Sequence, residues 1–320
     1  MPGRRSPPGH SFCHRAVTAE PVEPLVMTDD TVLAARGLGK RYRRRWALSD
    51  CTLTVPAGRV VGLVGPNGAG KTTLMRLAVG LLAPSTGTVE VLGGPPATSP
   101  AQLGRVGFVA QDTPTYANLS IADHLRLGGW LNARWDRGLA ERRIGQLGLD
   151  PRQRAGRLSG GQRAQLALAL SVAKRPELLV LDEPVASLDP LARREFLQGI
   201  SDVVAEHGVS VVLSSHLVAD LERVCDFAIV LVASRVRISG TIEELLATHH
   251  RLTRPHHQDI AGGETIQNIA GGEVVEARHT DKHSTLLVRS DGPIQDPRWM
   301  VEAASLEDIV LAYMGTEVRS

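Results

Sequence analysis

A glycine-rich turn between two apolar segments constrains this chain more than any other feature. Residues 60–64 read VVGLV, residues 65–73 read GPNGAGKTT, and residues 74–82 read LMRLAVGLL. An apolar strand, then G-x-x-x-x-G-K-T, then a helix is the setting in which such a loop wraps around phosphate groups. The glycines let backbone N–H groups point inward, and the helix N-terminus adds a favourable dipole. The sequence therefore predicts an α/β fold that binds a nucleoside triphosphate.

This loop supplies the first candidate binding residues. The Lys71 ammonium is expected to neutralise charge on the β- and γ-phosphates, and the Thr72 hydroxyl to bind Mg²⁺. The nucleotide-binding candidates are Gly65, Pro66, Asn67, Gly68, Ala69, Gly70, Lys71, Thr72 and Thr73.

Two carboxylates follow a second apolar segment. Residues 178–181 read LLVL and lead into Asp182 and Glu183. Sheets of α/β proteins build their sites at the carboxyl ends of parallel strands. An acidic turn after a buried strand is common by itself, but it gains meaning beside a phosphate loop. Asp182 is expected to hold Mg²⁺, and Glu183 is expected to polarise the water that attacks the γ-phosphate.

A second anion-binding arrangement lies between these two motifs. Residues 158–162 read LSGGQ, and the apolar run AQLALALSVA follows closely. A serine and two glycines that open a helix offer a hydroxyl and free N–H groups to an anion. The chain has one lysine-bearing phosphate loop, so two such sites suggest two subunits that share nucleotide.

With LSGGQ, the sequence resembles the ATP-binding subunits of ABC transporters over about residues 31–248. Further markers occur in the order typical of that family. They are Tyr42 for the aromatic that stacks on adenine, Gln111 after RVGFVA for the Q-loop, Asp189 in SLD for the D-loop, and His216 after VSVVLSS for the switch histidine.

The resemblance implies a role for each of these markers. Gln111 would sense Mg²⁺ and water as a further metal-site residue, and His216 would contact the γ-phosphate. From the residues alone, His216 could instead be a histidine at a strand end whose hydrogen bonds are met by the protein. Tyr42 could be an aromatic residue that only packs against its neighbours. The family also implies a head-to-tail dimer of identical or different subunits. In that dimer, the phosphate loop of one chain faces Ser159, Gly160, Gly161 and Gln162 of the other.

The function implied by the resemblance is ATP hydrolysis that powers transport through a separate membrane permease. Residues 306–315 resemble the tail of ATPase subunits from exporters, which favours export of a drug, lipid or peptide over import. No apolar run approaches the roughly 18 residues of a transmembrane helix. The chain is therefore expected in the cytoplasm, held on the inner face of the cell membrane by its permease. Three scattered cysteines fit that reducing compartment.

The alternative is a soluble ABC ATPase that acts in macromolecular assembly, or on nucleic acid or ribosomes. The segment between Lys71 and Ser159 shows no sustained heptads for the coiled coil of chromosome-maintenance relatives. Translation-factor relatives carry two cassettes in one chain, whereas this chain has a single lysine-bearing phosphate loop. A net charge of +2 provides no field that favours nucleic acid. The basic residues around Tyr42 are therefore expected to form a solvated face, and no nucleic-acid partner is expected.

The predicted architecture is a P-loop NTPase core with a mostly parallel sheet. A small antiparallel β subdomain is expected near residues 31–57 and 88–92, and a helical subdomain is inserted at about 112–165. Ser120 and Asp123 form a capping-box pattern at the start of one of its helices. A second helix is predicted over about 138–147. Residues 1–30 are expected to be a disordered extension.

Residues 249–320 are predicted to be a C-terminal extension that ends in a helix. The paired histidines of its first part could bind a metal, but no Cys or carboxylate residues at ligand spacing accompany them, so a solvated linker is expected there. These residues are His249, His250, His256 and His257. The nine-residue repeats IAGGETIQN and IAGGEVVEA are too few for a solenoid and favour a hairpin or a local duplication. The role of residues 249–304 is left open between regulation, dimer contact and tether.

The final helix carries its own signals. Ser305 with Asp308 predicts an N-terminal cap. An apolar stripe at helical spacing follows, and such a stripe needs a docking surface on this chain or on a partner. Its members are Leu306, Ile309, Val310 and Tyr313.

Overall fold

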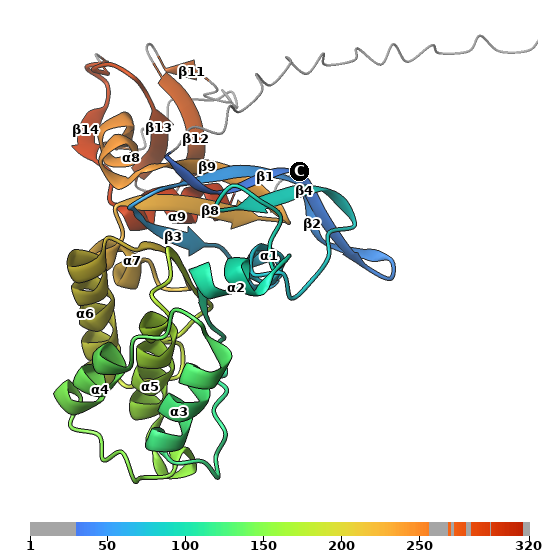
Figure 1. Cartoon of the computed structure of the whole chain (residues 1–320). Helices are drawn as coiled ribbons and strands as arrows, with labels where there is room; N and C mark the ends of the chain where they lie inside the picture. Colours follow the sequence, from blue (N-terminus) through green and yellow to red (C-terminus); the bar gives the residue numbers. More distant parts are fainter. Residues whose placement is uncertain (1–29, 256–267, 270–271, 280–282, 295, 316–320) are drawn as a thin grey trace, which may run out of the picture.

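A computed structural model describes residues 30–255, 268–269, 272–279, 283–294 and 296–315. At its centre is a six-stranded sheet in the order β5-β6-β7-β3-β8-β9 (Figure 1). Neighbouring strands are parallel from β5 to β8, and β9 is antiparallel to β8. This confirms the predicted α/β fold. The strands are β3 (Val60–Val64), β5 (Val106–Val109), β6 (Leu178–Leu181), β7 (Ser210–Ser215), β8 (Phe227–Val232) and β9 (Arg235–Thr241).

Both faces of this sheet are covered, which is why its central strands are continuously apolar. On β6, Leu178 and Val180 pack toward the β subdomain, whereas Leu179 and Leu181 pack toward helices on the other face. The helices on that other face include α6 (Pro190–His207) and α7 (Val218–Val224). Because β3, β6 and β7 run in parallel, the residues that follow them meet at one edge of the sheet.

The predicted antiparallel β subdomain is confirmed as a three-stranded sheet in the order β2-β1-β4. Its strands are β1 (Thr31–Tyr42), β2 (Arg45–Pro56) and β4 (Thr86–Val91). Buried residues such as Leu38 and Leu48 join it to the central sheet and to α1 (Lys71–Ala78). The β1–β2 hairpin projects from the body of the protein (Figure 1).

Helices form a separate region below the sheet in Figure 1. Its core includes Ile121, Ile144 and Leu166, each buried. The predicted capping box is present, since the Ser120 hydroxyl accepts a hydrogen bond from the Asp123 N–H at 3.1 Å. Its helices are α3 (Ile121–Leu131), α4 (Arg137–Gln146) and α5 (Gly160–Ala173), whereas α2 (Pro100–Arg105) leads into β5.

A third sheet begins after residue 248, where the sequence predicts a solvated linker. It is antiparallel, in the order β11-β12-β13-β10-β14, and follows α8 (Ile242–Thr248). The bounds are β10 (His249–Pro255), β11 (Asn268–Ile269), β12 (Gly272–His279), β13 (His283–Arg289) and β14 (Met300–Ala303).

The linker expectation is therefore wrong for residues 249–255, the described part of the segment with the paired histidines. His249 has no exposed surface, its Nδ1 lies 2.9 Å from the Leu245 carbonyl oxygen, and its Nε2 lies 3.1 Å from the Tyr313 hydroxyl. The two ring nitrogens thus bind protein groups, as a buried histidine requires. His256, His257 and the first copy of the repeat lie outside the described residues except for Asn268, and so does the predicted N-terminal extension up to residue 29.

The last helix, α9 (Leu306–Gly315), forms where the sequence predicts it. The Ser305 hydroxyl accepts a hydrogen bond from the Asp308 N–H at 3.0 Å. Leu306, Ile309 and Val310 are buried against the large core, so the docking surface belongs to this chain. Among the described residues, no helix combines the length and apolar character that a membrane crossing needs.

Candidate functional site

The phosphate loop connects β3 to α1 and is packed tightly from two sides. A Cβ at Gly65 would lie 2.1 Å from the Leu231 carbonyl oxygen, and one at Gly70 would lie 2.4 Å from the Ala47 carbonyl oxygen. Gly70 also has φ +109°, a conformation that favours glycine. Only glycine fits both positions, so the loop follows a fixed path between the central sheet and β2.

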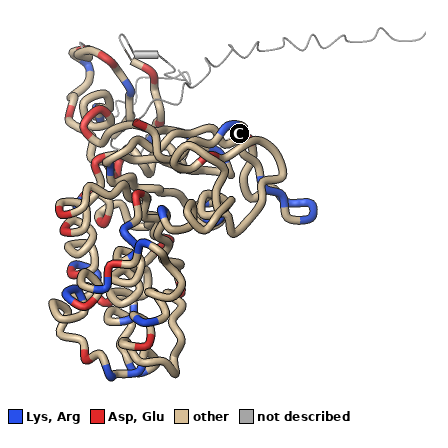
Figure 2. The backbone as a smooth tube through the Cα atoms, in the orientation of Figure 1, with Lys and Arg blue, Asp and Glu red and all other residues tan. Residues whose placement is uncertain are grey.

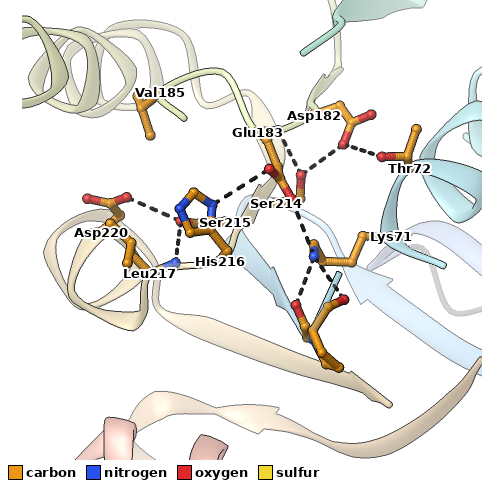
Figure 3. A network of polar contacts seen from close by, with 12 residues as sticks. Lys71, Thr72, Asp182, Glu183, Val185, Ser214, Ser215, His216, Leu217 and Asp220 are labelled. Atoms are coloured by element: carbon orange, nitrogen blue, oxygen red, sulfur yellow. Dashed lines mark hydrogen bonds and ion pairs between the residues drawn. The ribbon is translucent and has the colours of Figure 1, made fainter. Parts of the chain in front are cut away.

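Lys71 points back into this loop. Its side chain is 4% exposed, and its Nζ donates a hydrogen bond of 2.8 Å to the Gly65 carbonyl oxygen. The same ammonium lies 3.3 Å from Oε1 of Glu183. The structure thus brings together the loop lysine and the second carboxylate of the acidic pair, as Figure 3 shows.

Asp182 directly precedes Glu183 at the carboxyl end of β6. Its Oδ1 accepts hydrogen bonds of 3.1 Å from the Thr72 and Ser214 hydroxyls. Burial raises the pKa of Asp182, and these two hydrogen bonds counteract part of that rise. A hydroxyl and a carboxylate oxygen therefore converge at the start of α1. Oxygen donors of this kind are the ligands that Mg²⁺ prefers.

Glu183 is held in an unusual backbone conformation. Its φ is +45°, and its N–H donates a hydrogen bond of 2.8 Å to the Ser214 hydroxyl. A non-glycine residue in this region is strained by about 1–3 kcal/mol and is often found at functional sites. The conformation places Oε2 of Glu183 3.6 Å from Nδ1 of His216. The carboxylate thus lies between an ammonium and an imidazole.

His216 follows β7 and is reachable from solvent, with 42% of its side chain exposed. The turn that carries it is fixed by Ser215, whose hydroxyl donates to Asp220 at 3.2 Å and accepts from the Leu217 N–H at 3.0 Å (Figure 3). The sequence analysis missed Ser214, Ser215 and Asp220. The signal was the pair of hydroxyl residues that ends an otherwise apolar strand, directly before the histidine.

The LSGGQ segment (residues 158–162) and the D-loop residue Asp189 lie at the starts of helices. Ser159 and Gln162 form a capping box at α5, in which the Ser159 N–H donates to the Gln162 side chain at 3.0 Å. Asp189 caps α6 by accepting from the Leu191 and Ala192 N–H groups at 3.0 Å. The two starts are adjacent, because a Cβ at Gly161 would lie 2.7 Å from the Ala192 Cβ.

Three groups of predicted residues lie outside the polar network of Figure 3. Residues 159–162 make no hydrogen bond or ion pair with the phosphate loop in the described part of the chain, and Ser159 and Gln162 are exposed. Gln111 is exposed after β5, and no polar contact joins it to the network within the described ranges. Tyr42 is 46% exposed at the end of β1. Its partner across the hairpin is Arg45, whose guanidinium lies near the phosphate loop.

Comparisons with known proteins identify relatives of this chain. The sequence model of the ABC transporter family matches residues 48–186. The chain is 30% identical to the Nod factor export ATP-binding protein I of Cupriavidus pinatubonensis, over 94% of this chain and 96% of that protein. It is 36% identical to the thiamine import ATP-binding protein ThiQ of Salmonella choleraesuis, over 61% of this chain and 86% of that protein.

Solved structures show the same fold. The structure of an ATP-binding subunit of an ABC transporter matches with a TM-score of 0.60 and 27% identity. The match covers 67% of this chain and 92% of that structure.

Proposed function

The chain belongs to the ATP-binding subunits of ABC transporters, and from this we propose that it powers export through a separate membrane permease. Members of this family are ATPases coupled to transport, and this chain is one of them. The observation that carries the direction is the extent of the match. The export relative matches over 94% of the chain, so most of the C-terminal sheet falls within the match. The thiamine import relative matches over 61%.

Glu183 is the proposed catalytic base. Its carboxylate would polarise the attacking water, and His216 would contact the γ-phosphate. The 3.6 Å between the two side chains supports a shared task at one phosphate. Lys71, now bonded to Glu183 and to the Gly65 carbonyl, would transfer its ammonium contacts to phosphate oxygens when ATP binds.

Thr72 and Asp182 are the proposed holders of Mg²⁺, with Gln111 as a further metal-site residue. The Thr72 and Asp182 oxygens lie 3.1 Å apart and are of the type that this cation prefers. When bound, the ion neutralises charge that develops on the phosphates during transfer. Within the described residues no cluster of three or more His, Cys, Asp or Glu side chains could hold a metal. A site completed by phosphate oxygens needs no such cluster.

We place each ATP between two subunits, either identical or different. Ser159, Gly160, Gly161 and Gln162 would bind the nucleotide held by the phosphate loop of the partner. This placement is supported by their position at the capped start of α5, where they make no polar contact with the phosphate loop of their own chain within the described residues. Asp189 would lie at the same interface, because the starts of α5 and α6 are adjacent. Tyr42 would stack on adenine.

The helical subdomain is the proposed contact with the permease. A groove of about 760 Å³ lies between α3 and α4, lined by Leu125, Trp130, Trp135 and Ile144 among others. Trp130 is 81% exposed there. An apolar helix of a membrane subunit would cover it, and that contact would hold the chain at the inner face of the cell membrane.

The test is a capture experiment with a variant that keeps ATP. Tagged Glu183→Gln is purified from native membranes with ATP, and the proteins that accompany it are identified. The matched control is Lys71→Ala, which should bind ATP poorly. A multi-span membrane protein enriched with Glu183→Gln and depleted with Lys71→Ala would support the transporter function. Ribosomes, nucleic acid or a soluble assembly in its place would overturn it and leave ATP hydrolysis standing.

A further inference from the structure

The tip of the β1–β2 hairpin carries three consecutive arginines beside the nucleotide site. Figure 2 shows this tip as a continuous basic segment that projects from the protein. Arg43 has φ +54°, and the turn closes with Tyr42 paired to Arg45. Side chains of directly paired residues lie on the same face of a hairpin. Arg45 therefore shares a face with the aromatic residue proposed to stack on adenine.

Two other cations of the hairpin, Lys40 and Arg41, are held by neighbouring groups. Lys40 donates a hydrogen bond of 2.7 Å to the Ala83 carbonyl oxygen, and its Nζ lies 5.6 Å from the centre of the Tyr42 ring. The Arg41 guanidinium lies 5.6 Å from the centre of the Trp46 ring, on the opposite face. For Arg45, no hydrogen bond or ion pair is present within the described residues, and its side chain is exposed.

The Arg45 guanidinium lies next to the phosphate loop. Its Nη2 would be 4.0 Å from a Cβ placed on Gly68, the central glycine of the loop. An independent contact fixes the hairpin against the loop, since a Cβ on Gly70 would lie 2.4 Å from the Ala47 carbonyl oxygen of β2. The position of Arg45 thus follows from how β2 is packed and not only from the choice of one side-chain rotamer.

The loop itself offers a single buried cation to a highly charged ligand. This cation is Lys71, whose ammonium contacts the Gly65 carbonyl oxygen and whose side chain is 4% exposed. A guanidinium presents several N–H donors in a planar fork that matches phosphate oxygens. Arg45 is exposed to solvent, and its guanidinium lies beside Gly68 of the same loop.

We propose that Arg45 binds the phosphate chain of ATP from the hairpin side, so that the nucleotide is held between the phosphate loop and the β subdomain. The proposal rests on ATP binding at the site described above. Arg45 makes its contact in both the substrate and the transition-state complex, so it contributes to affinity and not to the rate of the chemical step.

The experiment compares full-length wild type, Arg45→Ala, Arg45→Lys and the matched control Arg44→Ala. Titration calorimetry gives the ATP dissociation constant at several KCl concentrations, and steady-state hydrolysis gives kcat and KM. Loss of one charge-assisted contact should weaken ATP binding about tenfold in Arg45→Ala. Arg45→Lys should lose less, and Arg44→Ala should match wild type. kcat should be unchanged in all four proteins.

Salt dependence separates a charge contact from a change in shape. ATP affinity should fall less steeply with KCl in Arg45→Ala than in wild type, because one cation no longer faces the phosphates. Equal ATP affinity in Arg45→Ala and Arg44→Ala would overturn the proposal. So would a loss of affinity with an unchanged salt dependence. If wild type and Arg44→Ala also failed to bind ATP, the site itself would be refuted, which is a distinct result.

Discussion

The Lys71 ammonium and the Glu183 carboxylate lie 3.3 Å apart, with 4% and 11% of their side chains exposed. Each is therefore the main counter-charge of the other, at a site where both side chains have little contact with solvent. Removal of one partner from such a pair leaves a buried charge without compensation. Lys71 has a second acceptor in the Gly65 carbonyl oxygen, and Glu183 has the His216 imidazole on its other side. The pair can thus open for a phosphate while each group keeps one contact.

Glu183→Gln should bind ATP but hydrolyse it at least about 100-fold more slowly, because general-base catalysis typically contributes that much or more. The amide keeps the size of the side chain and loses the basic oxygen. Single-turnover hydrolysis and ATP titration measure the two effects separately. Glu222→Gln, an exposed change on α7, is the matched control and should behave as wild type. Wild-type turnover in Glu183→Gln would refute the base assignment.

Asp182→Asn should stabilise the protein at pH 7 while it abolishes hydrolysis. Burial raises the pKa of Asp182, so the native state binds a proton more readily than the unfolded chain does. Stability from this group is therefore present below the ordinary aspartate pKa and is lost as pH rises through the raised native value. Asparagine keeps a side-chain oxygen for Thr72 and Ser214 without the charge. Thermal melts should run from about pH 3.5, near the ordinary aspartate pKa, up to about pH 8. The increase in melting temperature of Asp182→Asn over wild type should shrink toward low pH.

Asp123→Asn is the control with the opposite sign. Hydrogen bonds from the Ser120 side chain and backbone lower the pKa of Asp123 to about 2. The ionised carboxylate thus stabilises the fold above the ordinary aspartate pKa, and this contribution is lost as pH falls toward about 2. The variant should melt below wild type at pH 7. Equal pH profiles for the two asparagine variants would contradict both assignments.

The central fold could be predicted because its signals are local. β3 and β6 are short apolar runs, the glycines of the phosphate loop stand where the backbone needs them, and Ser120 with Asp123 marks a helix start. Tertiary context agrees with each of these preferences. The candidate site follows from the same fact, because parallel strands carry their following residues to one edge.

The C-terminal sheet could not be predicted because its signals are not local. β10 reads HHRLTRP, with one strongly apolar residue, Leu252, among polar ones. This leucine pairs with Leu286 and Val301 and is buried in a cluster with Leu286, Val288 and Trp299, all of them far along the chain. The polar network was missed for a similar reason. Ser214 and Ser215 act through bonds to Asp182 and Asp220 that no spacing in the sequence reveals.

Gln111→Ala should leave ATP affinity intact and abolish the stimulation of hydrolysis by the permease. Gln111 is exposed between β5 and the helical subdomain, outside the polar network of Figure 3. A residue in that position can report the γ-phosphate to the subdomain that contacts the permease. ATP titration and hydrolysis with and without the permease in lipid give the two readouts. Full retention of stimulation would show that the subdomain is coupled by another route.

Ile309→Ala should destabilise the protein by about 3 kcal/mol, because α9 is an integral part of the large core. Ile309 has no exposed surface and packs in the cluster that also contains residues of β7 and α7. Leu311→Ala is the matched control on the same helix, where the leucine is 45% exposed, and it should cost far less. Urea unfolding, followed by circular dichroism, measures both. Equal small losses would mean that α9 is only peripherally attached. A large loss confined to Ile309→Ala would show that the helix stabilises the same core that positions His216, because β7 and α7 flank the turn that carries this residue.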